Sequence, residues 1–202
     1  MKTTVVLFGG NGYIGRELTR QWQQADAQAE FWVVSRSGHN DLQATNVHNL
    51  ALDLTDLAAV KAALPTKIDY MVDLIGRPDA DTSQQLAINQ APALVMQQLA
   101  EAYHVRAMGF VGGKLGPKSF VALKASIIQR LRTSELPLAV VEPTLVYGAG
   151  RHDSMSRLVP LLKIGGLFNA NLKPVTVATV AAQLLAKLRE VGGQTDKVTA
   201  NY

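Results

Sequence analysis

Gly9, Gly12 and Gly15 recur at intervals of three residues directly after an apolar run near the start of the chain. Because glycine inside a strand or helix costs conformational order, such a cluster indicates a tight turn or a close approach of the backbone to a ligand. Gly9 can begin the turn, Gly12 can bring the backbone near a pyrophosphate, and Gly15 can pack a following helix against the strand. The free N–H groups and positive dipole end of that helix would face the phosphates. The spacing therefore predicts a dinucleotide-binding loop, with a purely structural turn as the alternative. The remaining residues of the predicted loop are Asn11, Tyr13 and Ile14.

A second signal lies about 20 residues further on, where a protein that selects NAD usually carries an acidic residue for the ribose 2′-hydroxyl. This chain carries Ser35, Arg36 and Ser37 there. A guanidinium beside two hydroxyls suits a 2′-phosphate dianion and offers little to a pair of ribose hydroxyls. The predicted cofactor is therefore NADP(H). The alternative is that Arg36 is only a solvent-exposed loop charge.

These residues need a framework that brings strand ends and loops together, and the apolar pattern of the chain predicts one. Runs rich in Val, Ile, Leu and aromatic residues are expected to be buried strands at 3–8, 30–35, 47–52, 70–75, 107–112 and 138–143. Segments of helical period lie between or beside them at 13–24, 55–63, 83–103 and 118–133. Parallel strands joined by helices need both faces of their sheet covered. The expected fold is α/β, a doubly wound parallel sheet of the Rossmann type in a single domain over 1–202, with a small C-terminal helical element.

The segment 150–202 departs from this alternation and is short for a substrate-binding lobe. We expect a helix over 154–163 and a second helix over 175–190, closed by the glycine pair 192–193. The last residues, 197–202, are expected to add an edge strand.

Composition limits the classes of function. The chain has 202 residues, of which 48% are hydrophobic and 18% charged, which is enough for one good core. It has no cysteine and four scattered histidines without ligand spacing, so no metal site is expected. No apolar run approaches the roughly 18 residues of a membrane span, and the N-terminus lacks the marks of a signal peptide. A cytoplasmic protein without a membrane span is therefore expected.

The net charge of +4 is a mild excess. The densest basic stretch lacks the interleaved aromatic residues of a nucleic-acid platform, so we interpret it as a solvated helix face and expect no nucleic-acid partner. Its members are Lys114, Lys118, Lys124, Arg130 and Arg132. The expected partners are the dinucleotide and a small apolar or aromatic acceptor, and the sequence predicts no particular oligomeric state.

Several stretches together resemble the short-chain dehydrogenase/reductase superfamily over nearly the whole chain. They are GGNGYIG at the start, Asp53-Leu54 after the third run, Leu74-Ile75-Gly76 after the fourth, and Lys124 near the start of a later helix. The glycine spacing is similar to that of the extended and atypical branches, and PTLVYGAG after the sixth run is similar to their segment near the nicotinamide. The resemblance implies adenine contacts for Asp53 and Leu54, and a ribose beside Ile75 and Gly76. It also implies that Lys124 binds the nicotinamide ribose and that Pro143 and Val146 lie near the nicotinamide.

The catalytic centre departs from the superfamily's pattern. Its Tyr-x-x-x-Lys motif would fall on residues 120–124, so Phe120 stands at the tyrosine position and only Lys124 is retained. Its serine would fall at Gly112 or Gly113. Phenylalanine cannot pass a proton to or from a substrate oxygen, which removes an acid–base contribution of roughly 100- to 10,000-fold. No residue is therefore assigned as catalytic, and ordinary carbonyl or sugar chemistry is disfavoured. If Lys124 does not hold the ribose, the alternative is a plain helix-surface lysine.

Two further positions also differ from epimerase-like members, since Ile128 replaces a frequent Glu and Glu142 replaces a frequent Arg. The segment 173–188 resembles atypical members related to the complex I accessory subunit and to NADP-sensing transcriptional regulators, with Thr179 where Asp is often found.

The sequence leaves three functional interpretations open. The first is an NADP(H)-binding protein whose dinucleotide is a structural or sensed ligand. The second is an NADPH-dependent reductase of flavins or quinones, which can take hydride without the tyrosine relay. The third is an assembly subunit on the same scaffold. For the reductase, an apolar pocket is expected from residues that could equally be core: Phe120, Leu145, Val146, Tyr147, Met155 and Phe168.

Overall fold

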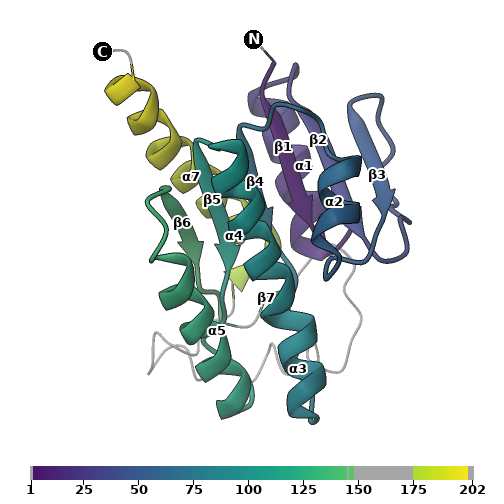
Figure 1. Cartoon of the computed structure of the whole chain (residues 1–202), viewed down its shortest axis with the longest axis vertical. Coiled ribbons are helices and arrows are strands. Elements are labelled where there is room, and N and C mark those ends of the chain that lie inside the picture. The colour runs from purple at the N-terminus through teal and green to yellow at the C-terminus, as the bar shows by residue number, and fades with distance from the viewer. Residues whose placement is uncertain (1, 145, 148–174, 200–202) are drawn as a thin grey trace.

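The computed structural model describes residues 2–144, 146–147 and 175–199, and the side chains of 194–199 are left out of the description. A six-stranded parallel sheet forms the centre of the molecule, with strand order β3-β2-β1-β4-β5-β6 (Figure 1). Its strands are β1 Thr4–Phe8, β2 Glu30–Ser35, β3 Val47–Ala51, β4 Tyr70–Asp73, β5 Ala107–Val111 and β6 Leu138–Val141. Each lies within one of the apolar runs predicted as strands. The order reverses between β1 and β4, and ligands of such sheets bind beyond the carboxyl ends of the strands at that point.

Helices cover both faces of the sheet (Figure 1). They are α1 Tyr13–Ala25, α2 Leu57–Ala63, α3 Thr82–Asn89, α4 Ala91–Tyr103, α5 Lys118–Leu131 and α7 Val177–Thr199. One buried apolar cluster lies between the sheet, α1 and α7, and the other lies between the sheet, α2, α4 and α5. The predicted doubly wound α/β fold with a C-terminal helix is therefore confirmed.

A second, two-stranded parallel sheet was not predicted. It pairs β7 Val146–Tyr147 with β8 Val175–Thr176. The strands are only two residues long, so the sequence holds no periodic signal for them.

The single helix predicted over 83–103 is wrong, because the structure divides this stretch into α3 and α4 at Gln90. Pro92 lies in the first turn of α4, and a proline cannot donate the backbone hydrogen bond that would continue α3.

The predicted end of the last helix is also wrong. α7 continues through Gly192 and Gly193 to Thr199, so residues 197–199 are helical where an edge strand was expected. A Cβ atom on Gly192 would lie 2.7 Å from Cε1 of Tyr70, a buried residue of β4. Glycine therefore lets α7 pass close to the sheet, and packing outweighs the low helix propensity of this residue.

Other predictions lie outside the described residues: the helix over 154–163 and the pocket residues Leu145, Met155 and Phe168. Among the helices of the described part of the chain, none combines the length and apolar character needed to cross a bilayer.

Candidate functional site

The glycine loop joins β1 to α1 in the geometry that its spacing predicts. Gly9 has a φ of 71°, a conformation that L-residues rarely adopt, and its N–H donates to the Val34 carbonyl at 2.9 Å. Gly12 is the N-cap of α1, where no side chain caps the first turn. A Cβ on Gly15 would lie 2.6 Å from the carbonyl carbon of Gly10, so only glycine lets the helix pack this closely. A helix start without a side-chain cap is the kind of site at which anions bind.

Tyr13 and Ile14 belong to the first turn of α1 and not to the loop, which corrects their predicted place. Both side chains are half-buried and pack against the apolar cluster between α1, α7 and the sheet.

A cavity of about 430 Å³ lies where the carboxyl ends of β1, β2, β3 and β4 meet. Predicted cofactor residues supply much of its lining: Gly9, Asn11, Ser35, Arg36, Ser37, Asp53, Leu54 and Ile75. Residues that sequence reasoning missed complete it: Thr55, Gln84, Ala87, Ile88 and Pro92. Most of the missed residues belong to α3 and α4, which carry no binding motif, so no sequence signal placed them here.

The corner that is predicted to receive the 2′-phosphate combines an exposed cation with two ordered hydroxyls. Arg36 and Ser37 are exposed and Ser35 is buried. The Ser35 hydroxyl accepts a hydrogen bond from the Gly38 N–H at 3.1 Å, and the Ser37 hydroxyl accepts one from the His39 N–H at 3.2 Å. Each hydroxyl keeps its own hydrogen to donate, and a phosphate offers acceptor oxygens.

Asp53 lies on the same side of the cavity and stays ionised. Its carboxylate accepts hydrogen bonds from the Thr55 N–H at 2.9 Å and from the Thr55 hydroxyl at 2.8 Å. These bonds lower the pKa of Asp53, and the nearby charge of Arg36 lowers it further by a smaller amount. Arg36 therefore faces a fixed negative charge in the unliganded protein.

Asn11 ties the glycine loop to the loop after β2, since its side-chain amide donates to the His39 carbonyl at 2.8 Å. Arg16 of α1 forms an ion pair with Asp41, which lies further along the loop after β2. These contacts hold together the two segments that form the phosphate side of the cavity.

A buried polar centre lies beneath the end of β4. Lys124 of α5 is only 2% exposed, and its ammonium donates to the Ile75 carbonyl at 2.7 Å. It also lies 4.4 Å from the ring centroid of Phe110. Burial lowers the pKa of Lys124 to about 8, and the charge of Asp73 opposes that shift. Lys124 is thus no surface lysine, and the interpretation as a plain helix-surface residue is wrong.

Asp73 and Asn89 are the residues of this centre that sequence reasoning missed. Burial raises the pKa of Asp73 to about 6, while Lys124 and the Ile75 N–H lower it. Asn89 is fully buried and bonds the backbone of Arg77 through both its oxygen and its nitrogen. An aspartate that ends the otherwise apolar run YMVD was a signal that could have been used.

Phe120 carries no group that could donate a proton, and its side chain lies in the core. The ring is buried against the loop after β5, since a Cβ on Gly116 would lie 3.2 Å from its Cδ1. A Cβ on Gly112 would meet Cγ of Glu142 at 2.9 Å and Cδ1 of Ile128 at 3.1 Å. A serine therefore does not fit at Gly112 unless these neighbours move.

The remaining predicted contacts are not among the residues that line this cavity: Gly12, Tyr13, Ile14, Gly15, Gly76, Lys124, Pro143 and Val146. Val146 is buried in β7, and Pro143 is half-buried.

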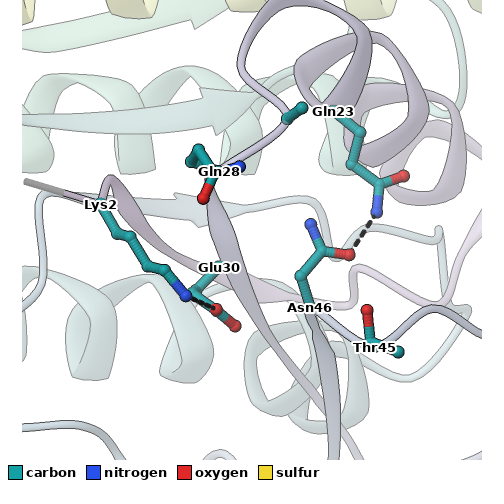
Figure 2. A pocket seen from close by; sticks show the side chains of 7 residues that line it. Lys2, Gln23, Gln28, Glu30, Thr45 and Asn46 are labelled. Atoms are coloured by element: carbon teal, nitrogen blue, oxygen red, sulfur yellow. Dashed lines mark hydrogen bonds and ion pairs between the residues drawn. The ribbon is translucent and has the colours of Figure 1, made fainter.

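A second cavity has a volume of about 540 Å³ and lies at the opposite end of the strands. Figure 2 shows the side chains that line it. Lys2 and Glu30 form an ion pair across it at 3.0 Å, and the Gln23 amide donates to Asn46 at 2.8 Å. It lies at the amino ends of the strands, where this class of sheet does not bind ligands. We therefore place the candidate site in the smaller cavity.

Residues 5–128 match the NAD dependent epimerase/dehydratase family. The chain belongs to this family. Among curated proteins, no significant sequence match is found.

Solved structures share the fold of this epimerase/dehydratase-family chain at low identity. WbmG of Bordetella bronchiseptica, solved with NAD, has 16% identity and a TM-score of 0.66, over 82% of this chain and 61% of its own. WbmH of the same organism, solved with NAD+, has 15% identity and a TM-score of 0.73, over 96% of this chain and 73% of its own. A Tyr→Phe variant of ElxO with NADPH bound has 16% identity and a TM-score of 0.71, over 94% of this chain and 92% of its own. The chain thus spans less than two thirds of the length of WbmG.

Proposed function

We propose that this protein binds NADP(H) in the cavity at the carboxyl ends of β1 to β4, as a structural or sensed ligand. The observation that carries the proposal is the cavity itself, which gathers the glycine loop, the Ser35-Arg36-Ser37 corner and Asp53 around one space. The uncapped start of α1 offers N–H groups to the pyrophosphate.

The preference for NADP(H) over NAD(H) rests on charge. Arg36 is the cation that lines the cavity, and Ser35 and Ser37 flank it with hydroxyls. The guanidinium of Arg36 already interacts with the charge of the Asp53 carboxylate. A phosphate dianion competes with that carboxylate for Arg36 far better than neutral ribose hydroxyls do. WbmG and WbmH were solved with NAD and the ElxO variant with NADPH, so relatives in fold accept either dinucleotide.

A binding role is favoured over ordinary reductase or epimerase chemistry because phenylalanine stands at the position of the superfamily's proton-donating tyrosine. Phe120 has no proton to give, and Gly112 cannot become the missing hydroxyl residue without a shift of Glu142. These departures also support the atypical branch of the short-chain dehydrogenase/reductase superfamily, related to the complex I accessory subunit or to NADP-sensing regulators.

The second candidate is an NADPH-dependent reductase of flavins or quinones. It is kept because Phe120 presents an apolar ring in place of a phenol, and such acceptors take hydride without the tyrosine relay. An assembly subunit has no observation in its favour and is not developed.

The deciding experiment is NADPH oxidation, followed at the reduced nicotinamide absorbance, with a panel of flavins, quinones and small aldehydes. The proposal expects tight NADPH binding and no steady turnover with any acceptor. Sustained turnover with a flavin or quinone would establish the second candidate, and turnover with an aldehyde would contradict both.

A further inference from the structure

The loop that joins β2 to β3 begins with the two exposed residues that are predicted to receive the 2′-phosphate, Arg36 and Ser37. Directly after them the chain turns at Gly38, which has a φ of 65°. The Gly38 N–H donates to the Ser35 hydroxyl at 3.1 Å, and a Cβ on Gly38 would lie 2.9 Å from Cβ of Ala51 in β3. The loop therefore passes close to the end of β3, and the contacts beyond Gly38 help to fix where Arg36 and Ser37 lie.

Asn40 is the point at which this loop is buried. Among residues 36–46, all of which the structure describes, only Asn40 is buried, with 3% of its surface exposed. Its side-chain oxygen accepts from the Leu42 N–H at 3.0 Å, and its side-chain nitrogen donates to the side-chain oxygen of Asn49 in β3 at 2.9 Å. Its backbone carbonyl accepts from the Gln43 amide at 2.6 Å. A buried amide costs free energy unless its donor and its acceptor are both bonded, so Asn40 favours the one loop conformation that bonds both.

The orientation of the Asn40 amide follows from the chain itself. A backbone N–H can only donate, so the atom that faces the Leu42 N–H is the amide oxygen, and the nitrogen then faces Asn49. Asn40 thus joins the loop to β3 with its donor and to the following turn with its acceptor. An apolar residue at this position would leave the Leu42 N–H and the Asn49 oxygen without these bonds.

The residues on either side of Asn40 connect the same loop to the glycine loop and to α1. The His39 carbonyl accepts from the side-chain amide of Asn11 at 2.8 Å, and Asp41 forms an ion pair with Arg16. Asn11 also lines the candidate cavity. Asp41 is exposed, and an exposed ion pair contributes little on its own. The buried Asn40 between these two contacts is therefore the main anchor of the loop.

We infer that Asn40 is a positioning residue for the 2′-phosphate, which holds the loop after β2 so that Arg36 and Ser37 line the cavity. Asn40 is not among the residues that line the cavity, so it acts through the loop backbone. This inference deepens the proposed function and rests on it for the ligand measurements. It adds a determinant of dinucleotide choice that the spacing of the sequence does not indicate.

The test is calorimetry with NADPH and NADH, which differ only in the 2′-phosphate. Asn40→Ala removes two side-chain hydrogen bonds, so ligand binding must then supply the order that they provide. NADPH affinity should fall about 10-fold, whereas NADH affinity should stay within about twofold, because neutral ribose hydroxyls gain little from Arg36. Asn49→Ala, which removes one of the two bonds, should lower NADPH affinity about threefold. Thr45→Ala, a change of an exposed residue of the same loop, is the matched control and should change neither affinity.

A double variant separates positioning from a general structural role. If Asn40 acts by placing Arg36, then adding Asn40→Ala to Arg36→Ala should lower NADPH affinity by less than about twofold, because the group to be placed is already gone. A further 10-fold loss in the double variant would overturn the inference. Equal weakening of NADPH and NADH by Asn40→Ala would overturn it as well, and so would an unchanged NADPH affinity.

Hydrogen exchange of the unliganded protein tests the anchor without any ligand. The Leu42 amide donates to the Asn40 side chain, so it should exchange at least about 10-fold faster in Asn40→Ala than in the wild-type protein or in Thr45→Ala. An equal rate in the wild-type protein and Asn40→Ala would refute the anchor. If the wild-type protein showed no preference for NADPH, the proposed function would fail, and the exchange result would still decide whether Asn40 holds the loop.

Discussion

The free energy of unfolding of the wild-type protein should depend on pH through the carboxyl group of Asp73, and Asp73→Asn should remove that dependence. Burial raises the pKa of Asp73 from 3.8 to about 6. A carboxyl group with a raised pKa contributes stability that is fully present below 3.8 and is lost as the pH rises through about 6. The shift corresponds to about 3 kcal/mol over the whole range, of which about 1 kcal/mol falls between pH 5 and pH 7.

The titration of Lys124 limits the pH range in which the stabilities of the wild-type protein and Asp73→Asn can be compared. Burial lowers its pKa from 10.5 to about 8, so its contribution to stability is present above 10.5 and is lost as the pH falls through about 8. The Asp73 carboxylate and the Lys124 ammonium are therefore both charged between about pH 6 and pH 8, where their burial costs the most stability. In Asp73→Asn the lysine loses its counter-charge and its pKa falls further, so the comparison belongs below pH 7.

The assay is urea denaturation of both proteins at several pH values from 5 to 7. The dependence of the unfolding free energy on urea concentration must be the same in both proteins. Relative to Asp73→Asn, the wild-type protein should lose about 1 kcal/mol of unfolding free energy as the pH rises across this range. Glu101→Gln, a carboxyl-to-amide change on the surface of α4, controls for the change of functional group. A difference between wild type and Asp73→Asn that stays constant with pH, or that changes in the opposite direction, would refute the raised pKa of the buried Asp73 carboxyl group.

Four further substitutions test the loop and the catalytic position. Gly12→Val should keep the fold, because the φ of −74° at Gly12 suits any residue, but should cut NADPH affinity at least about 10-fold by blocking the pyrophosphate; full affinity in calorimetry would reject the loop assignment. Gly15→Ala should lower the free energy of unfolding by about 1 to 3 kcal/mol, because its Cβ meets the Gly10 backbone; an unchanged midpoint in urea would show that α1 can shift away. Phe120→Tyr should keep NADPH binding and create weak aldehyde reduction, which the wild-type protein should lack. Under the second candidate, Tyr147→Phe should leave the flavin or quinone reduction intact. Loss of native turnover in Tyr147→Phe would reveal a displaced proton donor.

The sheet could be predicted from the sequence because its strands are buried on both faces and stand out as short apolar runs. Part of the cavity lining could be predicted as well, since Gly9, Ser35, Arg36 and Asp53 are fixed by their positions at strand ends. The contribution of Gln84, Ala87 and Ile88 to the cavity lining could not be predicted, because α3 has no motif and reaches the cavity only through tertiary packing.

The predictions that were wrong failed because the deciding contacts come from residues that are distant in the sequence. Gly192 is a helix terminator by local propensity, but it lies against Tyr70, and that contact is remote in sequence. The burial of Lys124 depends on the space above Gly76, which no spacing within α5 indicates. Local patterns therefore place strands and phosphate loops, whereas the direction of a long polar side chain depends on neighbours from other elements.

The central claim is that this protein selects NADP(H) through Arg36 at the mouth of the cavity. The most direct test is calorimetric titration of the wild-type protein and Arg36→Ala with NADPH and NADH. The wild-type protein should prefer NADPH, and Arg36→Ala should lose about 1.5 to 3 kcal/mol of NADPH binding, roughly 10- to 150-fold, with little change for NADH. An unchanged NADPH-to-NADH preference in Arg36→Ala, or no preference in the wild-type protein, would contradict the account.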